Sequence, residues 1–186
     1  MPPPASPRDL PNILIVTGAM AAGKSTIAQA LAERLPRAVH LRGDVFRRMI
    51  VSGRVDPAPG TQIQWLSQLR LRQDIAVQAA RAYAAAGFTV IYQDIVTDAL
   101  GRIVEALADW RPGVVVLCPT AQTLAARDAA SEKTGYRGWT AEAFDQLLRA
   151  QTPRLGLWID NSNLTAQQTI DRILAQAADT RAGIGA

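Results

Sequence analysis

Short runs of apolar residues alternate with longer stretches in which apolar residues recur at helical spacing. The run NILIVT, at residues 12–17, has the nearly continuous apolar character of a strand buried on both faces. The predicted strands are residues 12–17, 38–41, 88–92, 114–118 and 155–159. The predicted helices are residues 24–34, 44–50, 61–86, 98–109, 141–150 and 165–178, with another that begins at residue 121. This alternation predicts an α/β fold, a parallel sheet sandwiched by helices.

The chain of 186 residues has the length of one ordinary domain, which we place at residues 12–180. Residues 1–11 are rich in proline and lack the apolar stretch of a signal peptide, so we expect a disordered tail. No apolar run reaches the roughly 18 residues that span a bilayer, and we expect no membrane partner. The single cysteine, Cys118, rules out an internal disulfide framework, which favours a cytoplasmic protein.

The formal net charge of +4 raises the question of a nucleic-acid partner. The basic residues are spread along the chain without a dense cluster, so we do not expect nucleic acid to be the partner. Only two of the 20 basic residues are lysines, Lys24 and Lys133. Lysine at position 24 is therefore an exception to the strong preference of this chain for arginine.

That lysine lies in a phosphate-binding motif, Gly18-x-x-x-x-Gly23-Lys24-Ser25, between a predicted strand and a predicted helix. The glycines let the backbone approach phosphates closely, and the helix N-terminus favours negative charge. Lys24 can reach the β- and γ-phosphates, and the Ser25 hydroxyl can ligate Mg²⁺. The sequence thus predicts a P-loop (Walker A) that binds ATP with Mg²⁺, although the motif itself does not separate ATP from GTP. The predicted nucleotide contacts are Gly18, Ala19, Met20, Ala21, Ala22, Gly23, Lys24, Ser25 and Thr26.

A P-loop alone does not say where the γ-phosphate goes. The Asn-Lys-x-Asp motif of GTPases is absent, since Lys133 is followed by Thr134 and Gly135, and AAA-type machines usually have longer chains. We expect an ATP-dependent phosphotransferase, a kinase that acts on a hydroxyl of a small molecule such as an antibiotic, a sugar or a nucleoside. A nucleotide or nucleic-acid end kinase and a non-catalytic nucleotide-sensing module remain alternatives. The oligomeric state is not predicted.

Four further segments carry a family resemblance over residues 12–178: 42–44 (RGD), 93–96 (QDIV), the region of Arg127, and 158–160 (WID). With the P-loop, they make the chain similar to small P-loop kinases around chloramphenicol phosphotransferase. Zeta toxins, polynucleotide kinases and gluconate kinases are more distantly similar. The resemblance implies a P-loop NTPase fold with strand order 2-3-1-4-5 and a short arginine-bearing lid. It also implies that the acceptor could be an antibiotic, which would mean antibiotic resistance.

The resemblance further implies that Asp44 is the catalytic base and contacts the acceptor. Its position after the second strand suits a carboxylate that orients a hydroxyl toward the transferred phosphoryl group. The alternative is a helix N-cap. Arg47 and Arg48 lie three and four residues further on, so one or both share a helical face with Asp44. They could pair with Asp44 or hold a substrate anion, or form a solvated basic face. We favour Arg47 as a substrate-binding residue, because the Asp-x-x-Arg spacing resembles that of zeta toxins and polynucleotide kinases.

Asp94 ends the third strand, at the sheet edge where ligands of such folds bind, and we expect it to help Ser25 hold Mg²⁺. Capping of the next helix is the alternative. Residues 127–139 carry the arginines expected in a lid that excludes water and neutralises charge on the phosphates. Arg127 is our first choice for the catalytic clamp on the nucleotide, and Arg137 our second, with a substrate contact. An ordinary basic surface loop is the alternative.

Overall fold

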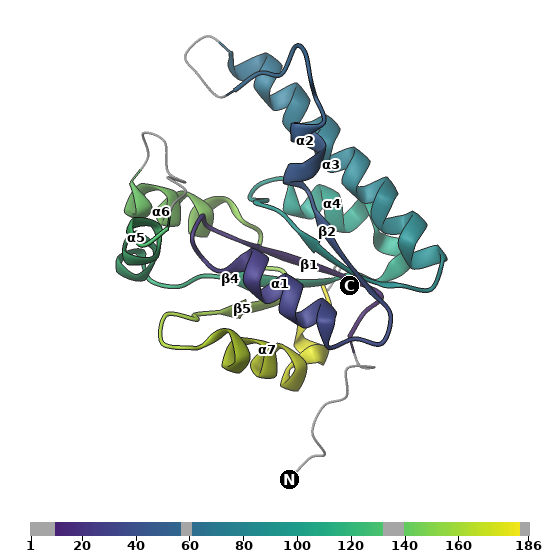
Figure 1. Cartoon of the computed structure of the whole chain (residues 1–186), viewed down its shortest axis with the longest axis vertical. Coiled ribbons are helices and arrows are strands. Elements are labelled where there is room, and N and C mark those ends of the chain that lie inside the picture. The colour runs from purple at the N-terminus through teal and green to yellow at the C-terminus, as the bar shows by residue number, and fades with distance from the viewer. Residues whose placement is uncertain (1–9, 57–60, 132–139, 183–186) are drawn as a thin grey trace.

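The computed structural model describes residues 10–56, 61–131 and 140–182, and it contains a five-stranded parallel sheet in the order β2-β3-β1-β4-β5 (Figure 1). This confirms the predicted fold class and strand order. The strands are β1 (Ile13–Gly18), β2 (Ala38–Arg42), β3 (Thr89–Gln93), β4 (Gly113–Leu117) and β5 (Leu157–Ile159).

The central strand β1 is buried along its whole length because it has a neighbour on each side and helices on each face. Ile13 is in register with Val90 of β3, and Ile15 is in register with Val114 of β4. Nearly continuous apolar sequence is what a strand in this position requires. As the carboxyl ends of parallel strands share one edge, Gly18, Arg42 and Gln93 come together there.

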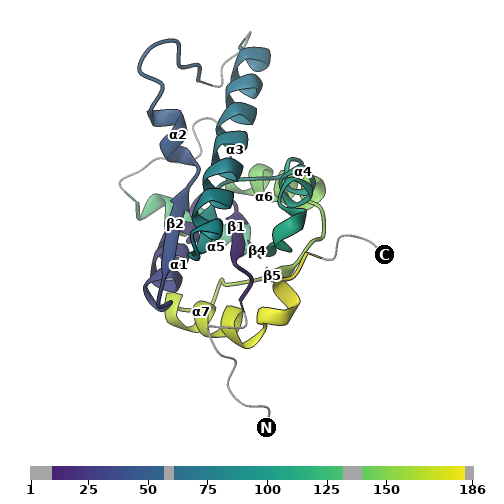
Figure 2. The ribbon, with the colours of Figure 1, turned by 90° about the vertical axis from the view of Figure 1, so that its right-hand side faces the viewer.

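Helices cover the two faces of the sheet, with α1 and α4 on opposite sides of β1 (Figure 2). The helices are α1 (Lys24–Glu33), α2 (Asp44–Arg48), α3 (Gln62–Ala85), α4 (Leu100–Ala106), α5 (Ala121–Ala129), α6 (Ala141–Gln151) and α7 (Ala166–Ala175), with 3-10 turns η2 (Ala108–Trp110) and η3 (Ala177–Thr180). Within the described residues, no helix combines the length and apolar character needed to cross a membrane.

One part of the chain projects beyond the sheet edge (Figures 1 and 2). It consists of α2, residues 49–56 and the first half of α3 up to Arg72, and we call it the arm. Six of the eight large apolar side chains that are exposed in the described residues lie in the arm: Val45, Met49, Val51, Ile63, Leu66 and Leu71. The other two, Ile75 and Tyr83, lie further along α3. The rest of the domain buries its apolar residues around the sheet.

The predicted elements differ from the observed ones mainly at their ends. The predicted helix 98–109 is two pieces, α4 and η2. The predicted strand 155–159 begins only at Leu157, because Gly156 has φ +65° and interrupts the extended backbone. Leu10 and Pro11, which we assigned to the tail, pack against the domain: Leu10 is buried, and Pro11 approaches Gly113 at the start of β4. Residues 1–9 lie outside the described part.

Candidate active site

The P-loop connects β1 to α1 at the carboxyl edge of the sheet. Gly18 has φ +148°, and a Cβ there would overlap the Leu117 carbonyl oxygen of β4. Gly23 precedes α1 in a left-handed conformation, and no side chain caps the helix. The amides of the first turn are therefore left for a ligand, and the dipole of α1 favours an anion at this point.

Lys24 is buried in the P-loop, with 7% of its surface exposed. Its Nζ donates a hydrogen bond of 2.6 Å to the Ala19 carbonyl oxygen. Burial lowers the pKa of Lys24 to about 8, and the nearby charge of Asp94 opposes this effect only in part. A phosphate placed in the loop would supply the negatively charged partner that stabilises the buried ammonium group.

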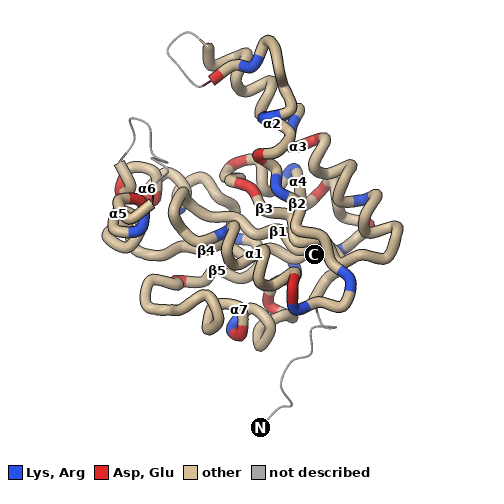
Figure 3. Tube along the Cα trace, in the orientation of Figure 1, with Lys and Arg blue, Asp and Glu red and all other residues tan. Residues whose placement is uncertain are grey.

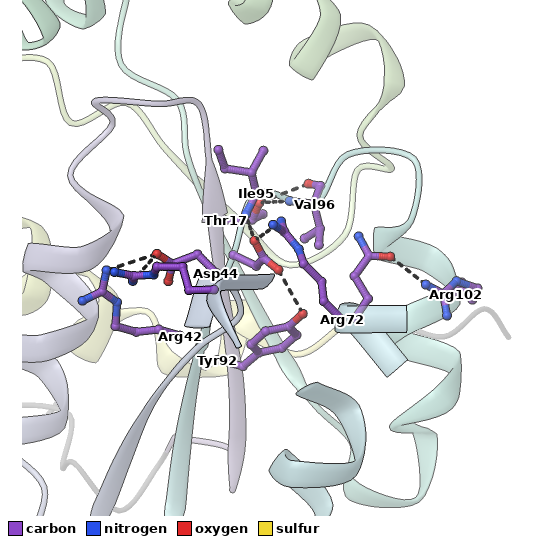
Figure 4. Close-up of polar contacts among 11 residues, drawn as sticks. Thr17, Arg42, Asp44, Arg72, Tyr92, Ile95, Val96 and Arg102 are labelled. Carbon is purple, nitrogen blue, oxygen red and sulfur yellow. Dashed lines mark hydrogen bonds and ion pairs between the residues drawn. The ribbon is translucent and has the colours of Figure 1, made fainter. Parts of the chain in front are cut away.

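Asp94 follows β3 and is almost fully buried. Arg72 of α3 donates to its Oδ1 over 2.7 Å, the Ile95 amide donates to the same oxygen, and the Tyr92 hydroxyl points at Oδ2 from 3.5 Å (Figure 4). Burial raises the pKa of Asp94, whereas the Arg72 guanidinium lowers it. The charges of Lys24 and Asp44 also act on it, in opposite directions. The carboxylate thus stands between the P-loop and the end of β2.

The backbone next to Asp94 leaves no room for a side chain. A Cβ on Gly43 would overlap the Asp94 carboxylate, and the Gly43 amide donates to the Gln93 carbonyl oxygen over 2.9 Å. Glycine between Arg42 and Asp44 is therefore required if Asp94 is to keep its present position.

Ser25 lies in a chain of polar side chains that sequence reasoning largely missed. Its Oγ donates to Gln93 Oε1 over 3.2 Å, and His40 Nε2 lies 3.2 Å from the same oxygen. The other ring nitrogen of His40 lies 2.8 Å from Gln29 Oε1, and burial lowers the pKa of this histidine. His40 thus helps to fix the side-chain amide of Gln93 that holds Ser25.

The groups around Ser25 suit a magnesium ion. The Ser25 hydroxyl, the Gln93 amide oxygen and the Asp94 carboxylate are hard oxygen donors, which Mg²⁺ prefers. Within the described residues, no three His, Cys, Asp or Glu side chains group as a metal cage. An ion here would depend on nucleotide phosphates and water for its other ligands, which is how Mg²⁺ is usually held beside phosphates. That Ser25 and Asp94 hold the metal remains a prediction.

Asp44 is the first residue of α2, directly after β2. Its Oδ2 accepts from Arg48 over 2.6 Å and from Arg42 over 3.4 Å (Figure 4). Its Oδ1 is buried and has no hydrogen-bond partner within the described residues. The alternative role of Asp44 as a helix N-cap is wrong, since Gly43 occupies that position and no side chain caps α2. An unpaired buried oxygen at the end of β2 is suited to accept a hydrogen bond from a ligand.

Arg47 does not pair with Asp44. It forms an ion pair with Asp56 instead, and Arg48 is the arginine that holds Asp44. Arg47 lines a narrow hollow between α2 and α3, beside Trp65 and Arg72. The complete lining is Arg47, Val55, Trp65, Gln68, Leu69 and Arg72. The hollow is walled by the long helix and the loop before it.

On the other side of the P-loop, Arg127 of α5 donates from Nη2 to the Asn161 carbonyl oxygen over 2.9 Å. The Asn161 side chain donates to the Ala22 carbonyl oxygen over 3.0 Å, so it fastens the P-loop to the segment after β5. A hollow of about 230 Å³ opens here, lined by Gly23, Thr26, Ile27, Arg127, Asn161, Leu164, Ala166 and Thr169. Arg127 is thus placed beside the P-loop, whereas Arg137 lies outside the described residues.

Comparisons with known proteins agree with this geometry. A family model described as AAA domain matches residues 13–154, most of the chain. This chain belongs to the AAA domain family. We excluded AAA-type machines because their chains are usually longer. The match shows that the AAA domain family also includes chains as short as this one. No curated protein sequence matches significantly.

Solved structures share the fold along nearly the whole chain. The tunicamycin resistance protein of Deinococcus radiodurans has a TM-score of 0.63 and 22% identity, over 93% of this chain and 98% of that one. Shikimate kinase from Acinetobacter baumannii, in complex with shikimate, has a TM-score of 0.60 and 20% identity, over 91% and 93%. A gluconokinase from Sinorhizobium meliloti has a TM-score of 0.58 and 16% identity, over 91% and 93%. At these identities the likeness establishes the P-loop kinase fold.

Proposed function

We propose that this protein is a kinase that transfers the γ-phosphoryl group of ATP to a hydroxyl of a small molecule. The observation that carries the proposal is the pairing of a P-loop with the Asp44 carboxylate at the end of β2, where Oδ1 is buried and unpaired. The fold shared with small kinases supports it. A module that only sensed nucleotides would not need an unpaired carboxylate oxygen at the end of β2.

In the proposed reaction, Asp44 Oδ1 accepts the hydroxyl proton as the acceptor oxygen bonds to the γ-phosphorus and the bond to the β-phosphate oxygen breaks. ADP leaves with the electron pair of that bond. Arg42 and Arg48 hold Oδ2, so they orient the carboxylate for this role. Phosphoryl transfer needs positioning and charge stabilisation more than covalent help, so one fixed carboxylate can suffice.

Lys24 binds the β- and γ-phosphates from the P-loop, and Arg127 approaches them from α5. Ser25 and Asp94 would hold Mg²⁺, which neutralises charge on the phosphates when it is bound. The arginine-bearing lid, including Arg137, is proposed to close over this site and exclude water. Water would otherwise take the phosphoryl group.

For the acceptor, we propose a small hydroxyl compound, with antibiotics, sugars and nucleosides as the classes to test. The tunicamycin resistance protein among the similar structures supports including antibiotics, as does the resemblance to chloramphenicol phosphotransferase. The surface beside Arg47 and Trp65 is the proposed acceptor site, because Arg47 lies on the same helix as Asp44. The narrow hollow there, about 10 Å³, would take only one group of the acceptor.

The test is phosphoryl transfer from labelled ATP to a panel of these compounds. With a confirmed acceptor, Asp44→Asn should lower kcat about 10²–10⁴-fold, as expected for loss of a general base, while the Kd for ATP stays the same. Asp74→Asn is the matched control, since Asp74 is ion-paired with Arg102 away from the P-loop. Unchanged turnover in Asp44→Asn would refute the base assignment. If no compound increases ADP production, the nucleotide-sensing alternative is favoured.

A further inference from the structure

The positive charge of the chain is concentrated around the arm. Residues 42–72 contain six arginines and two aspartates, an excess that equals the +4 of the whole chain. The remaining residues contain fourteen basic and fourteen acidic side chains. The even spread of basic residues noted above therefore hides a local excess, and Figure 3 shows basic positions on α2 and beside it. A field of one sign over a hollow attracts ligands of the opposite sign.

Within this region, Arg72 has a donor with nothing to bind. Its side chain is 15% exposed and pairs with Asp94 through Nη2. Its Nε is buried and has no hydrogen-bond partner within the described residues. A buried donor without an acceptor is rare in folded proteins and calls for an explanation such as a missing ligand. Because Arg72 lines the hollow between α2 and α3, an oxygen atom of a ligand there can be the missing acceptor.

The other walls of the hollow complete a site of a recognisable kind. Arg47 lines it together with Arg72, and Trp65 and Leu69 supply apolar surface. The ion pairs around the hollow and Asp44 are unequal. Arg42 and Arg48 share Asp44, which leaves one positive charge over at the end of β2, whereas Arg47 and Arg72 are each paired with one aspartate. The groups are Arg42, Arg47, Arg48 and Arg72 with Asp44, Asp56 and Asp94. Guanidinium groups match carboxylate and phosphate oxygens with paired hydrogen bonds.

We propose that the acceptor is an anion, a small hydroxyl compound that also carries a carboxylate or a phosphate, and that Arg72 and Arg47 bind this anionic group. The inference rests on the proposed kinase function and names its substrate class. The anionic group would sit in the hollow, with the hydroxyl directed to Asp44. The hollow, about 10 Å³, admits only the anionic group, and the rest of the acceptor would lie outside it.

The first experiment compares neutral acceptors with relatives of similar size that carry a carboxylate or a phosphate. Labelled ATP is offered with glucose, gluconate and glucose 6-phosphate, with glycerol, glycerate and glycerol 3-phosphate, and with a 5′-hydroxyl oligonucleotide. Transfer confined to charged small molecules supports the proposal. Transfer only to neutral compounds overturns it and leaves the kinase function standing. Transfer only to the oligonucleotide overturns it in favour of a nucleic-acid end kinase.

The second experiment uses variants of the hollow. Arg72→Gln and Arg47→Gln should each raise the KM for a charged acceptor about 10- to 100-fold, as expected for the loss of a hydrogen bond to a charged group. Arg47→Gln should leave the KM for ATP unchanged. Arg72→Gln also removes the partner of Asp94, so its effect on the acceptor is measured at saturating ATP and Mg²⁺. Arg72→Lys should recover part of the loss, because it keeps the charge without Nε. Arg70→Gln, which removes an exposed arginine from the same helix outside the hollow, should change KM less than twofold. Equal effects of Arg72→Gln and Arg70→Gln would overturn the proposal.

A binding measurement covers the case in which no compound in the panel is phosphorylated. Saturating ADP and Mg²⁺ fill the P-loop, and the melting temperature is then followed with each charged and neutral member of a set. A rise with the charged member alone, absent in Arg72→Gln and Arg47→Gln, supports an anion site even if transfer fails. No difference between charged and neutral members overturns it. Absence of both transfer and binding removes the kinase proposal as well.

Discussion

The burial of Lys24 makes nucleotide binding dependent on pH in a range where few groups titrate. The ammonium must be charged to bind phosphates, and its pKa in the ligand-free protein is lowered to about 8. Lys24 is then protonated in about nine of ten protein molecules at pH 7 and in about one of ten at pH 9. The Kd for ATP should therefore rise about tenfold between pH 7 and pH 9. The last phosphate proton is lost near pH 6, so ATP itself contributes little to this change.

Isothermal titration calorimetry in two buffers with different ionisation enthalpies tests this directly. Bound phosphates restore the charge, so ATP binding at pH 9 should take up about 0.9 proton per site, against about 0.1 at pH 7. Lys24→Arg is the matched control, because arginine stays charged throughout the range and should show neither the affinity change nor the uptake. A change in Kd below twofold, or the same pH dependence in Lys24→Arg, would refute the reasoning.

The same shift affects stability. The unfolded chain keeps the ordinary lysine pKa of 10.5, so between pH 8 and 10.5 it binds more protons than the ligand-free folded chain. Stability therefore increases with pH through this window, by about 2 kcal/mol between pH 7 and pH 9.5. Urea unfolding at several pH values gives the free energy of unfolding of the wild type and of Lys24→Met. The difference between the two pH profiles is the contribution of Lys24. Parallel pH profiles for the two proteins would contradict the lowered pKa.

Two substitutions test the contacts around the site. Gly43→Ala places a methyl group on the Asp94 carboxylate and should destabilise the fold by roughly 1–3 kcal/mol in a urea melt. Gly101→Ala, in α4, brings its methyl group no closer than 4.0 Å to Pro153 Cγ and should instead stabilise by roughly 0.5–1 kcal/mol. Equal effects of the two glycine changes would mean that Asp94 is not held in place. Asn161→Ala removes the hydrogen bond to the Ala22 carbonyl oxygen and should lower stability by about 1 kcal/mol. It should also weaken ATP binding, measured by calorimetry. An unchanged affinity for ATP would contradict the role of Asn161 in fixing the P-loop.

The sequence predicted the parts of the site that depend on local order. The P-loop residues are contiguous, and their strand and helix follow from nearly continuous and helical apolar patterns. Asp44 and Asp94 follow predicted strands, and parallel strands bring such ends to one edge. These placements need only the strand order, which the family resemblance implied and the structure confirmed.

Contacts made by helix faces were harder to predict. Arg70 and Arg72 are two residues apart in one long helix, and no local pattern distinguishes them. A turn of about 100° per residue sends their side chains in different directions, so that Arg72 reaches Asp94 while Arg70 is exposed. Likewise Arg47 and Arg48 both share a face with Asp44, and only the path of residues 49–56 gives Arg47 a different partner, Asp56. Such choices depend on packing between distant segments.

The two ends of the folded domain meet at the start of β4. Pro11 and Thr180 both approach Gly113 closely, and the Ala182 amide donates to the Pro112 carbonyl oxygen. These contacts lie at the amino edge of the parallel sheet, whereas the P-loop and Asp44 lie at its carboxyl edge. An affinity tag, a surface tether or a fused fluorescent protein at either terminus therefore leaves the catalytic side open. A short peptide linking the two termini would allow circular permutation, with new ends cut in the loop between α6 and β5.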